Sequence, residues 1–269
     1  MIERILQFFR TKSYKKPEFK FNGIIPGDSP ALAIFSEFKT PFFDELALFY
    51  SIKEYHQKTV AIGIPEKENA FKFHFPYDTY LTFTKDIRIK IEKIFKNQKP
   101  VIYLLSPRTE VFADFPQHCS GLFSVAHKNF SKYYNLLADI PFEDMKDFAA
   151  NFLKTLKIPD RRQYFYKALN IPKSPRTSNV FVDTLDPTRL KKLRIPEGSY
   201  SMVELEGVIL IKDKPFSEQL NYLSRSCCLI GEDSLFTGYA LHYVLPVFND
   251  LCDEFYKNSN CHKLKEYKP

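Results

Sequence analysis

Asp233 and Ser234 are the residues best placed for chemistry near the C-terminal end of the sequence. They follow an apolar run at 227–230, which predicts a buried strand, and precede residues 235–243, which predict a helix. Open α/β sheets bind ligands at the carboxyl ends of their strands, and the unpaired N–H groups at a helix start suit a phosphate or another anion. We therefore expect both residues to contact substrate. The alternative is that they only cap the helix, as Asp and Ser routinely do.

A second candidate carboxylate, Asp44, lies at the start of a predicted helix at 42–56, after a predicted strand at 30–38. The helix start stabilises its anion, so Asp44 is expected to stay ionised and to accept a proton at neutral pH. Glu37, in the preceding loop, is a second candidate for the same role. The alternative is that Asp44 only complements the helix dipole, which is common in a first turn.

Basic and hydroxyl side chains cluster after a third predicted strand, at 179–182. Arg and Lys neutralise phosphate charge, so this cluster is a candidate binding site for an anionic group. A solvated basic turn is the alternative. Arg108, after the predicted strand at 101–105, is a further candidate for substrate binding. The clustered candidates are Thr184, Thr188, Arg189, Lys191 and Lys192.

The layout around Asp233 resembles the C-terminal nucleotide-sugar domain of GT-B glycosyltransferases, most closely glycosyltransferase family 9, the lipopolysaccharide heptosyltransferases. In that family a Gly-x-Asp-Thr/Ser-Gly turn follows a helix and a strand and opens a helix that leads to a further strand and a Pro-Val. The family also has a Gly-Asp at its first helix, whose Asp is thought to be the catalytic base, and Asp44 matches that position. The other matching residues are Gly231, Asp233, Ser234, Pro246 and Val247.

Three positions depart from the family pattern. Phe43 and Leu235 stand where the family has Gly, and Gly238 lies near the position of a His that many members carry. A Cβ at 235 hinders close approach of a ligand to the backbone. Only residues 186–215 are left to hold the base and ribose of a nucleotide, so these departures place the donor pocket in doubt.

Strands and helices alternate along the chain in two blocks. This pattern predicts an α/β protein of GT-B-like fold, with two Rossmann-like doubly wound domains facing across a cleft. Thr40 is the expected N-cap of the helix at 42–56, with Pro41 in its first position. The predicted organisation is a basic amphipathic segment at 1–26, an acceptor-side domain at 27–160, a linker at 161–178, a nucleotide-sugar-side domain at 179–248, and a closing helix with a basic tail at 249–269.

Composition limits the partners. A net charge of +7 suits nucleotides, phosphorylated glycans or anionic membranes. There are no CxxC pairs and no RNP-like aromatic motifs, so we expect no nucleic acid. The six histidines lack metal-binding spacing, and the eight glycines form neither a Walker loop nor GxGxxG, so we expect no metal and no cofactor. The five cysteines are odd in number and irregularly spaced, which predicts free thiols in a reducing compartment.

The first sixteen residues mix apolar and basic side chains. This is typical of a short amphipathic helix that lies in a membrane interface, although a helix docked on the protein's own surface fits equally well. A signal peptide is not indicated, because the apolar run is short and no small-residue cleavage site follows. We therefore expect a cytoplasmic protein that binds peripherally to the inner membrane.

The leading functional hypothesis is an inverting GT-B glycosyltransferase. The resemblance implies transfer of a sugar, such as heptose, from a nucleotide-diphosphate donor to lipopolysaccharide or a related lipid-linked surface glycan. The alternative is a catalytically inactive relative that serves as a scaffold or partner subunit in lipopolysaccharide core processing, for example beside a Kdo-removing enzyme. The two hypotheses separate on whether the donor pocket is intact.

Overall fold

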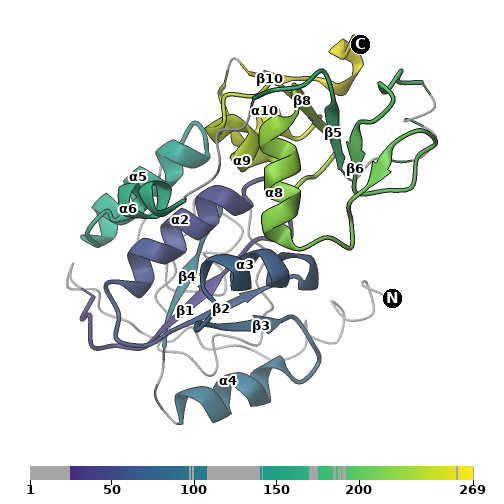
Figure 1. The fold of residues 1–269 in the computed structure, drawn as a ribbon. Coiled ribbons are helices and arrows are strands. Elements are labelled where there is room, and N and C mark those ends of the chain that lie inside the picture. The colour runs from purple at the N-terminus through teal and green to yellow at the C-terminus, as the bar shows by residue number, and fades with distance from the viewer. Residues whose placement is uncertain are drawn as a thin grey trace, which may run out of the picture.

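The computed structural model describes residues 25–268, except for 97, 99, 108–139, 141, 170–174, 184–185, 187–188, 190–191 and 259. The N-terminal half contains a four-stranded parallel sheet in the order β3-β2-β1-β4 (Figure 1). β1, β2 and β4 are short, largely apolar and buried runs, as central parallel strands are, whereas β3 at the edge has threonine at both ends. The strands are β1 (Ala31–Ile34), β2 (Thr59–Gly63), β3 (Thr79–Thr82) and β4 (Val101–Leu104).

Helices cover both faces of this sheet. Alternate residues such as Leu32 and Ile34 pack with Ile91 and Phe95 of α4 on one face. The opposite face belongs to the main core with α2, α3 and α5. This alternation follows from the two-residue period of a strand. The helices of this half are α2 (Phe42–Lys53), α3 (Glu68–His74), α4 (Ile87–Phe95), α5 (Met145–Leu156) and α6 (Arg162–Ala168), with a short 3-10 turn η2 at Pro65–Lys67 before α3.

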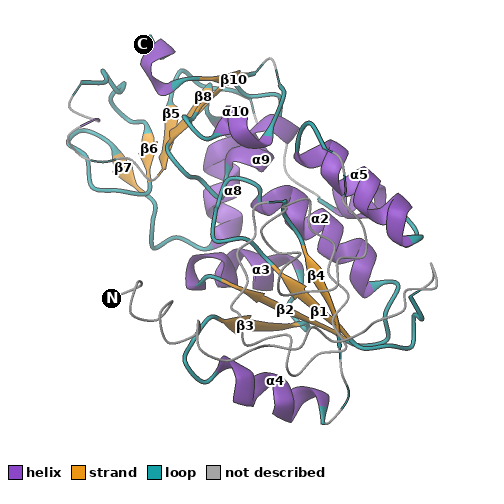
Figure 2. Cartoon of the chain, turned by 180° about the vertical axis from the view of Figure 1, so that it is seen from behind, coloured by secondary structure: helices purple, strands orange, loops and turns teal. Residues whose placement is uncertain are grey.

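The C-terminal half contains a six-stranded parallel sheet in the order β10-β9-β8-β5-β6-β7. Helices α8 (Phe216–Arg225) and α9 (Thr237–His242) lie on one face, and the 3-10 turn η5 (Leu264–Glu266) lies against the other (Figure 2). A single helical turn, α10 (Cys252–Phe255), precedes the last strand. The strands are β5 (Val180–Asp183), β6 (Tyr200–Ser201), β7 (Ile209–Leu210), β8 (Cys228–Gly231), β9 (Val247–Phe248) and β10 (Cys261–His262).

Each sheet reverses its strand order once, between β1 and β4 and between β5 and β8. Ligands of doubly wound sheets bind at such switch points, beyond the carboxyl ends of the strands. The loop after β1 leads to Asp44, and the loop after β8 contains Asp233 and Ser234. The two halves also share one hydrophobic core, which includes Phe43 from α2 and Tyr239 from α9. The two halves that carry the switch points therefore pack against each other.

The predicted α/β class, with Rossmann-like parallel sheets, is confirmed. Helix 42–56 ends earlier, at Lys53, and the closing helix shrinks to one turn. Residues 1–24 of the predicted N-terminal segment lie outside the described residues. The domain boundaries stay a prediction.

Within the part of the chain that the structure describes, no helix combines the length and apolar character needed to span a bilayer.

Two expectations about individual residues were wrong. Pro41 rather than Thr40 is the N-cap of α2, and no side chain caps that helix. The Thr40 hydroxyl instead donates to Asp233, an acceptor that the local sequence does not indicate. Cys252 and Cys261, expected to be free, are joined by a disulfide. Cys227 and Cys228 are free, as predicted.

The imidazole of His74, in α3, joins the two halves through α9. Its Nε2 lies 2.7 Å from the Tyr239 hydroxyl, and the two rings are stacked with an interplanar angle of 14°. Phe165 packs against the same imidazole at a centroid distance of 5.3 Å. Burial among these rings lowers the pKa of His74 from 6.5 to about 4.

We predict that acid destabilises the protein partly through His74. Because its pKa in the folded state is below the unfolded value, the unfolded chain takes up the proton first, and stability falls as the pH drops from 6.5 towards about 4. The contribution is up to ~3 kcal/mol. Urea unfolding of wild type and His74→Phe, followed from neutral pH into this window, should show a smaller loss for the variant. Equal losses would contradict the assignment. Since the pKa of His56 is lowered too, some acid sensitivity is expected to remain.

Candidate functional site

The carboxylate of Asp233 joins the two switch points. Its Oδ1 accepts hydrogen bonds from the backbone N–H of Lys39 (2.8 Å), the N–H of Thr40 (2.8 Å) and the Thr40 hydroxyl (2.9 Å). Its Oδ2 also accepts from the Lys39 N–H at 3.0 Å. Lys39 and Thr40 belong to the loop after β1, so a residue of the C-terminal sheet holds the N-terminal loop. We call this arrangement the Asp233 clasp.

A buried ion pair within the N-terminal half holds the same loop. Lys67 Nζ lies 2.6 Å from Glu45 Oε2, and both side chains are fully buried. Lys67 also donates to the Ser36 carbonyl (2.7 Å), while Glu45 Oε1 accepts from the Ser36 N–H (2.8 Å). A buried pair is tolerated only when its remaining hydrogen-bonding capacity is satisfied, and Ser36 satisfies it here. The loop is thus held at Ser36 by its own half and at Lys39 and Thr40 by Asp233.

Ser234 stabilises the C-terminal switch point. Its hydroxyl donates to Asp183 Oδ2 at 2.6 Å and accepts from the Phe236 N–H at 3.0 Å. The chain passes so close to β5 that a Cβ on Gly231 would come within 2.6 Å of the Asp183 carbonyl oxygen. Glycine is therefore required there for packing. Asp233 and Ser234 were expected either to contact substrate or to cap the helix. Both also make contacts with distant parts of the protein, which neither alternative had included.

Asp44 lines a pocket of about 560 Å³ between the two halves. α2 contributes Asp44 at its N-terminal turn, and α5 and α6 contribute the cations Lys146 and Arg162. Arg162 is neutralised in part by Asp160, whose Oδ2 lies 2.7 Å from Arg162 Nη2. The residues that line the pocket are Phe43, Asp44, Lys146, Asp160, Arg162, Gln163, Tyr166, Gly238, Leu241, His242 and Tyr256.

Two tyrosines hold the Asp44 carboxylate. The Tyr256 hydroxyl donates to Oδ2 at 2.7 Å, and the Tyr166 hydroxyl lies 3.4 Å from Oδ1. Burial raises the pKa of Asp44, and the Tyr256 hydrogen bond, Lys146 and Arg162 oppose that rise. A carboxylate with a raised pKa is a stronger proton acceptor. The expectation that the helix start stabilises the Asp44 anion was wrong in its net effect, because burial raises the pKa of this carboxyl. The two tyrosines come from distant segments that local sequence does not connect to Asp44.

Phe43 and Gly238 fit one another at the edge of this pocket. A Cβ on Gly238 would lie 2.3 Å from the Phe43 Cβ, a separation that no side chain permits. The Phe43 ring packs on Tyr239 with centroids 4.5 Å apart. Two of the three departures from the family pattern are therefore in contact, and a large residue at 43 requires glycine at 238.

The other predicted site residues do not gather at the pocket. Glu37 and Lys192 are exposed. Arg189 is also exposed and pairs with Glu232 at 2.8 Å and Asp250 at 3.2 Å. Arg108, Thr184, Thr188 and Lys191 lie outside the described residues.

Most of the pocket wall was not predicted from the sequence. Residues 161–178 were interpreted as a linker, yet Arg162 and Tyr166 line the pocket together with Asp160, and Tyr256 comes from the segment after α10. The run Asp160-Arg161-Arg162 was the only local signal, and charge alone does not indicate which side chains turn inward. Among the described residues, no group of three or more His, Cys, Asp and Glu side chains is placed to hold a metal ion.

No model of a known family matches the sequence, and no curated protein does. Solved structures do match. The E. coli heptosyltransferase WaaC with ADP-2-deoxy-2-fluoro heptose gives a TM-score of 0.52 at 8% identity, over 86% of this chain and 92% of that chain. WaaC with ADP gives 0.50 at 9% identity, over the same shares of 86% and 92%.

The glycosyl transferase family 9 protein from Veillonella parvula DSM 2008 gives a TM-score of 0.49 at 10% identity, over 84% of this chain and 81% of that chain. We base the fold assignment on the two WaaC structures. At such low identity the likeness concerns the fold. The fold of the chain is similar to that of the E. coli heptosyltransferase WaaC, so the resemblance to family 9 is confirmed at the level of the fold.

We predict that Asp233→Ala lowers the free energy of unfolding by at least ~2 kcal/mol, because it leaves two backbone N–H groups and a hydroxyl without their acceptor. Glu232→Ala, in the same turn, is the matched control. It removes only a surface ion pair with Arg189, worth up to ~1 kcal/mol. Urea unfolding measures both. Equal small losses would show that the Asp233 clasp contributes little.

We also predict strong coupling between positions 43 and 238. Gly238→Ala should destabilise the protein by ~1–3 kcal/mol, because the added methyl overlaps Phe43. In a Phe43→Gly background the same change should be neutral or stabilising by up to ~1 kcal/mol, since alanine favours a helix more than glycine does. A double-mutant cycle with no coupling would contradict the steric account.

Proposed function

We propose that this protein transfers a sugar from a nucleotide-diphosphate donor to a glycan acceptor, with Asp44 as the general base. The observation that carries the proposal is a buried carboxylate with a raised pKa at the wall of a pocket that also presents Lys146 and Arg162. A base in an inverting transfer must reach an acceptor hydroxyl while it is shielded from water. The burial of Asp44 and its place in the pocket lining support this role.

The reaction is a single displacement. The acceptor hydroxyl gives its proton to Asp44 as its oxygen attacks the anomeric carbon of the donor. The bond between that carbon and the diphosphate oxygen breaks, and the nucleoside diphosphate leaves with the electron pair. Lys146 and Arg162 compensate negative charge on the substrates, and charge compensation of this kind is usually a large part of catalysis.

The fold supports a nucleotide-sugar donor. Both WaaC structures were solved with an adenosine diphosphate ligand, one of them an ADP-heptose analogue. We propose the same class of donor here, bound between two Rossmann-like domains in a GT-B arrangement. Lipopolysaccharide or a related surface glycan at the inner membrane face is the proposed acceptor, and the basic N-terminus is the proposed membrane contact.

A non-catalytic, glycan-binding scaffold is the second candidate, and one observation favours it. Asp233 and Ser234, expected to serve the donor, are bonded to Lys39, Thr40 and Asp183 instead. A relative with these contacts fixed would keep the Asp44 pocket for a glycan but lack a donor site. It would act through a protein partner in lipopolysaccharide core processing.

We predict that Asp44→Asn lowers turnover by ~10²–10⁴-fold while the fold survives, because the amide keeps the size of the side chain but accepts no proton. The assay is transfer from ADP-, UDP- and GDP-sugars to purified lipopolysaccharide core, with near-ultraviolet circular dichroism to confirm folding. Glu37→Gln is the matched control, since Glu37 is the exposed carboxylate of the same loop.

Three outcomes separate the candidates. Loss of turnover in Asp44→Asn alone supports Asp44 as the base. Loss only in Glu37→Gln assigns the base to Glu37. If wild type shows no transfer and no nucleoside diphosphate raises its melting temperature, the scaffold is favoured, because a ligand of the folded state must raise that temperature.

A further inference from the structure

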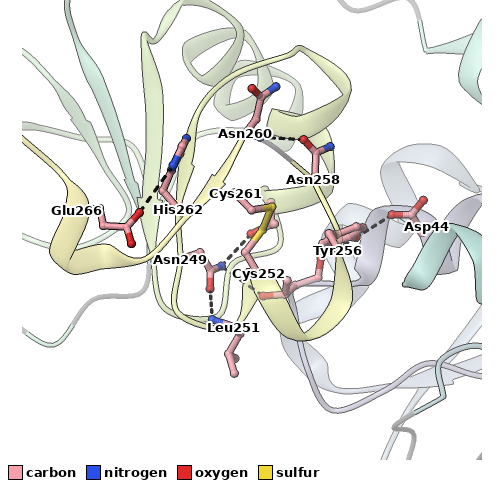
Figure 3. Close-up of a disulfide and its surroundings, with 12 residues drawn as sticks. Asp44, Asn249, Leu251, Cys252, Tyr256, Asn258, Asn260, Cys261, His262 and Glu266 are labelled. Atoms are coloured by element: carbon pink, nitrogen blue, oxygen red, sulfur yellow. Dashed lines mark hydrogen bonds and ion pairs between the residues drawn. A yellow bond between two sulfur atoms is a disulfide. The ribbon is translucent and has the colours of Figure 1, made fainter. Parts of the chain in front are cut away.

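The Cys252–Cys261 disulfide closes a short ring that contains Tyr256. Cys252 opens α10 and Cys261 opens β10, nine positions later, and the two sulfur atoms are bonded (Figure 3). Tyr256 directly follows α10 and is only 3% exposed. The ring belongs to the C-terminal half, yet Figure 3 shows the Tyr256 side chain reaching towards Asp44 of α2.

Tyr256 makes the shorter of the two hydrogen bonds to Asp44. Its hydroxyl donates to Asp44 Oδ2 at 2.7 Å and lies 3.3 Å from the Thr40 carbonyl. The Tyr166 hydroxyl is farther from the carboxylate, at 3.4 Å from Oδ1. The orientation of Asp44 therefore depends chiefly on where the ring places Tyr256.

The start of this ring is held by the Cys252 N–H, which donates to the Asn249 carbonyl, and by the Phe255 ring, which packs on Phe38. α10 is a single turn with no side-chain cap, and helices this short are not stable by themselves. The far end is anchored to the sheet, because the Asn260 carbonyl accepts from Val247 of β9 and the His262 carbonyl accepts from Asn249. The disulfide transmits that anchorage from β10 to α10 and hence to Tyr256.

We propose that Tyr256 is a positioning residue for Asp44 and that the Cys252–Cys261 disulfide sets its position, so that reduction of the disulfide changes the pocket. The inference rests on the proposed function only in that Asp44 is taken as the reacting group. It concerns a residue and a bond that the sequence analysis did not associate with the site.

The redox step needs a dithiol reductant. A thiolate of the reductant attacks the sulfur of Cys261, which is partly exposed, whereas Cys252 is fully buried. The Cys252 sulfur leaves as a thiolate and takes a proton. The second thiol of the reductant then displaces Cys261, which leaves two protein thiols and one cyclic disulfide. Reoxidation reverses these steps with an oxidised dithiol as the electron acceptor.

The expected consequence is a stronger affinity of Asp44 for its proton in the reduced protein. The Tyr256 hydrogen bond is the largest of the effects that lower the pKa of Asp44 against its burial. The other titratable or charged groups that face the pocket stay in place. They are Lys146 from α5, Arg162 and Tyr166 from α6, Asp160 in the preceding turn, and His242 from α9.

The test is a pH titration of the Asp44 carboxyl carbon by NMR in aspartate-labelled full-length protein, with Asp44→Asn for assignment. The titration midpoint should shift to higher pH after dithiothreitol treatment, in Tyr256→Phe, and in Cys252→Ala/Cys261→Ala without reductant. Reduction of Tyr256→Phe should add no further shift, because both changes act through one hydroxyl. Cys227→Ser/Cys228→Ser should respond to dithiothreitol like wild type.

An unchanged midpoint in reduced protein, with a thiol count that confirms two new thiols, would overturn the role of the disulfide. An unchanged midpoint in folded Tyr256→Phe would overturn the role of Tyr256, even if the reduced protein proved unstable. The readout needs neither donor nor acceptor, so absence of sugar transfer would count against the proposed function and leave this test intact.

Discussion

The structure depends on one carboxylate, that of Asp233, which accepts three hydrogen bonds from the loop that follows β1. Each doubly wound sheet ends in an irregular loop at its switch point, and two such loops would otherwise leave backbone N–H groups unpaired where the halves meet. Asp233 satisfies these groups with a charge-assisted acceptor, which is stronger than a neutral one. The buried Lys67–Glu45 pair holds the same loop at Ser36, so the path of the chain into α2 is fixed from both sides.

This constraint determines which chemistry each switch point can perform. At the C-terminal one, Asp233 and Ser234 are bonded within the protein, and Gly231 is required by the approach of β8 to β5. At the N-terminal one, the fixed loop directs Asp44 into a pocket, where it meets tyrosines and cations from other segments. Asp233, which was expected to bind a ligand, is therefore structural, whereas Asp44, which also has a simple explanation as a partner of the helix dipole, lines the pocket.

The sequence predicted the features that depend on neighbouring residues. The strands predicted at 30–38, 101–105, 179–182 and 227–230 correspond to β1, β4, β5 and β8, and the helices predicted at 42–56 and 235–243 correspond to α2 and α9, with ends displaced by a few positions. The weakly patterned elements β3, β6, β7 and β10 were missed, because two to four residues give little periodicity. The pocket wall could not be predicted, since it joins α2, α5, α6, α9 and the segment after α10, which meet only through tertiary packing.

The Cys252–Cys261 bond was missed for a related reason. An odd number of irregularly spaced cysteines argues against a disulfide framework but says nothing about one pair brought together by the pairing of β9 with β10. The departures from the family pattern at 43 and 238, by contrast, were noticed in the sequence, but the contact between them was not. Each looked like the separate loss of a family residue. The two positions are in contact, however, so the large side chain of Phe43 in α2 is matched by the absence of a side chain at Gly238 in α9.

The packing of Phe43 against α9 affects whether a donor can enter the Asp44 pocket. Opening the halves would break the three hydrogen bonds of the Asp233 clasp, at a net ~1 kcal/mol each, which alone is a modest barrier to a minor open state. It would also separate Phe43 from Tyr239 and expose the core that both halves share, and each large side chain exposed costs a further ~1.5–3 kcal/mol. The loss of packing costs more free energy than the loss of the hydrogen bonds. A transferase built on this chain must therefore admit its donor at the existing Asp44 pocket, without separating the two halves.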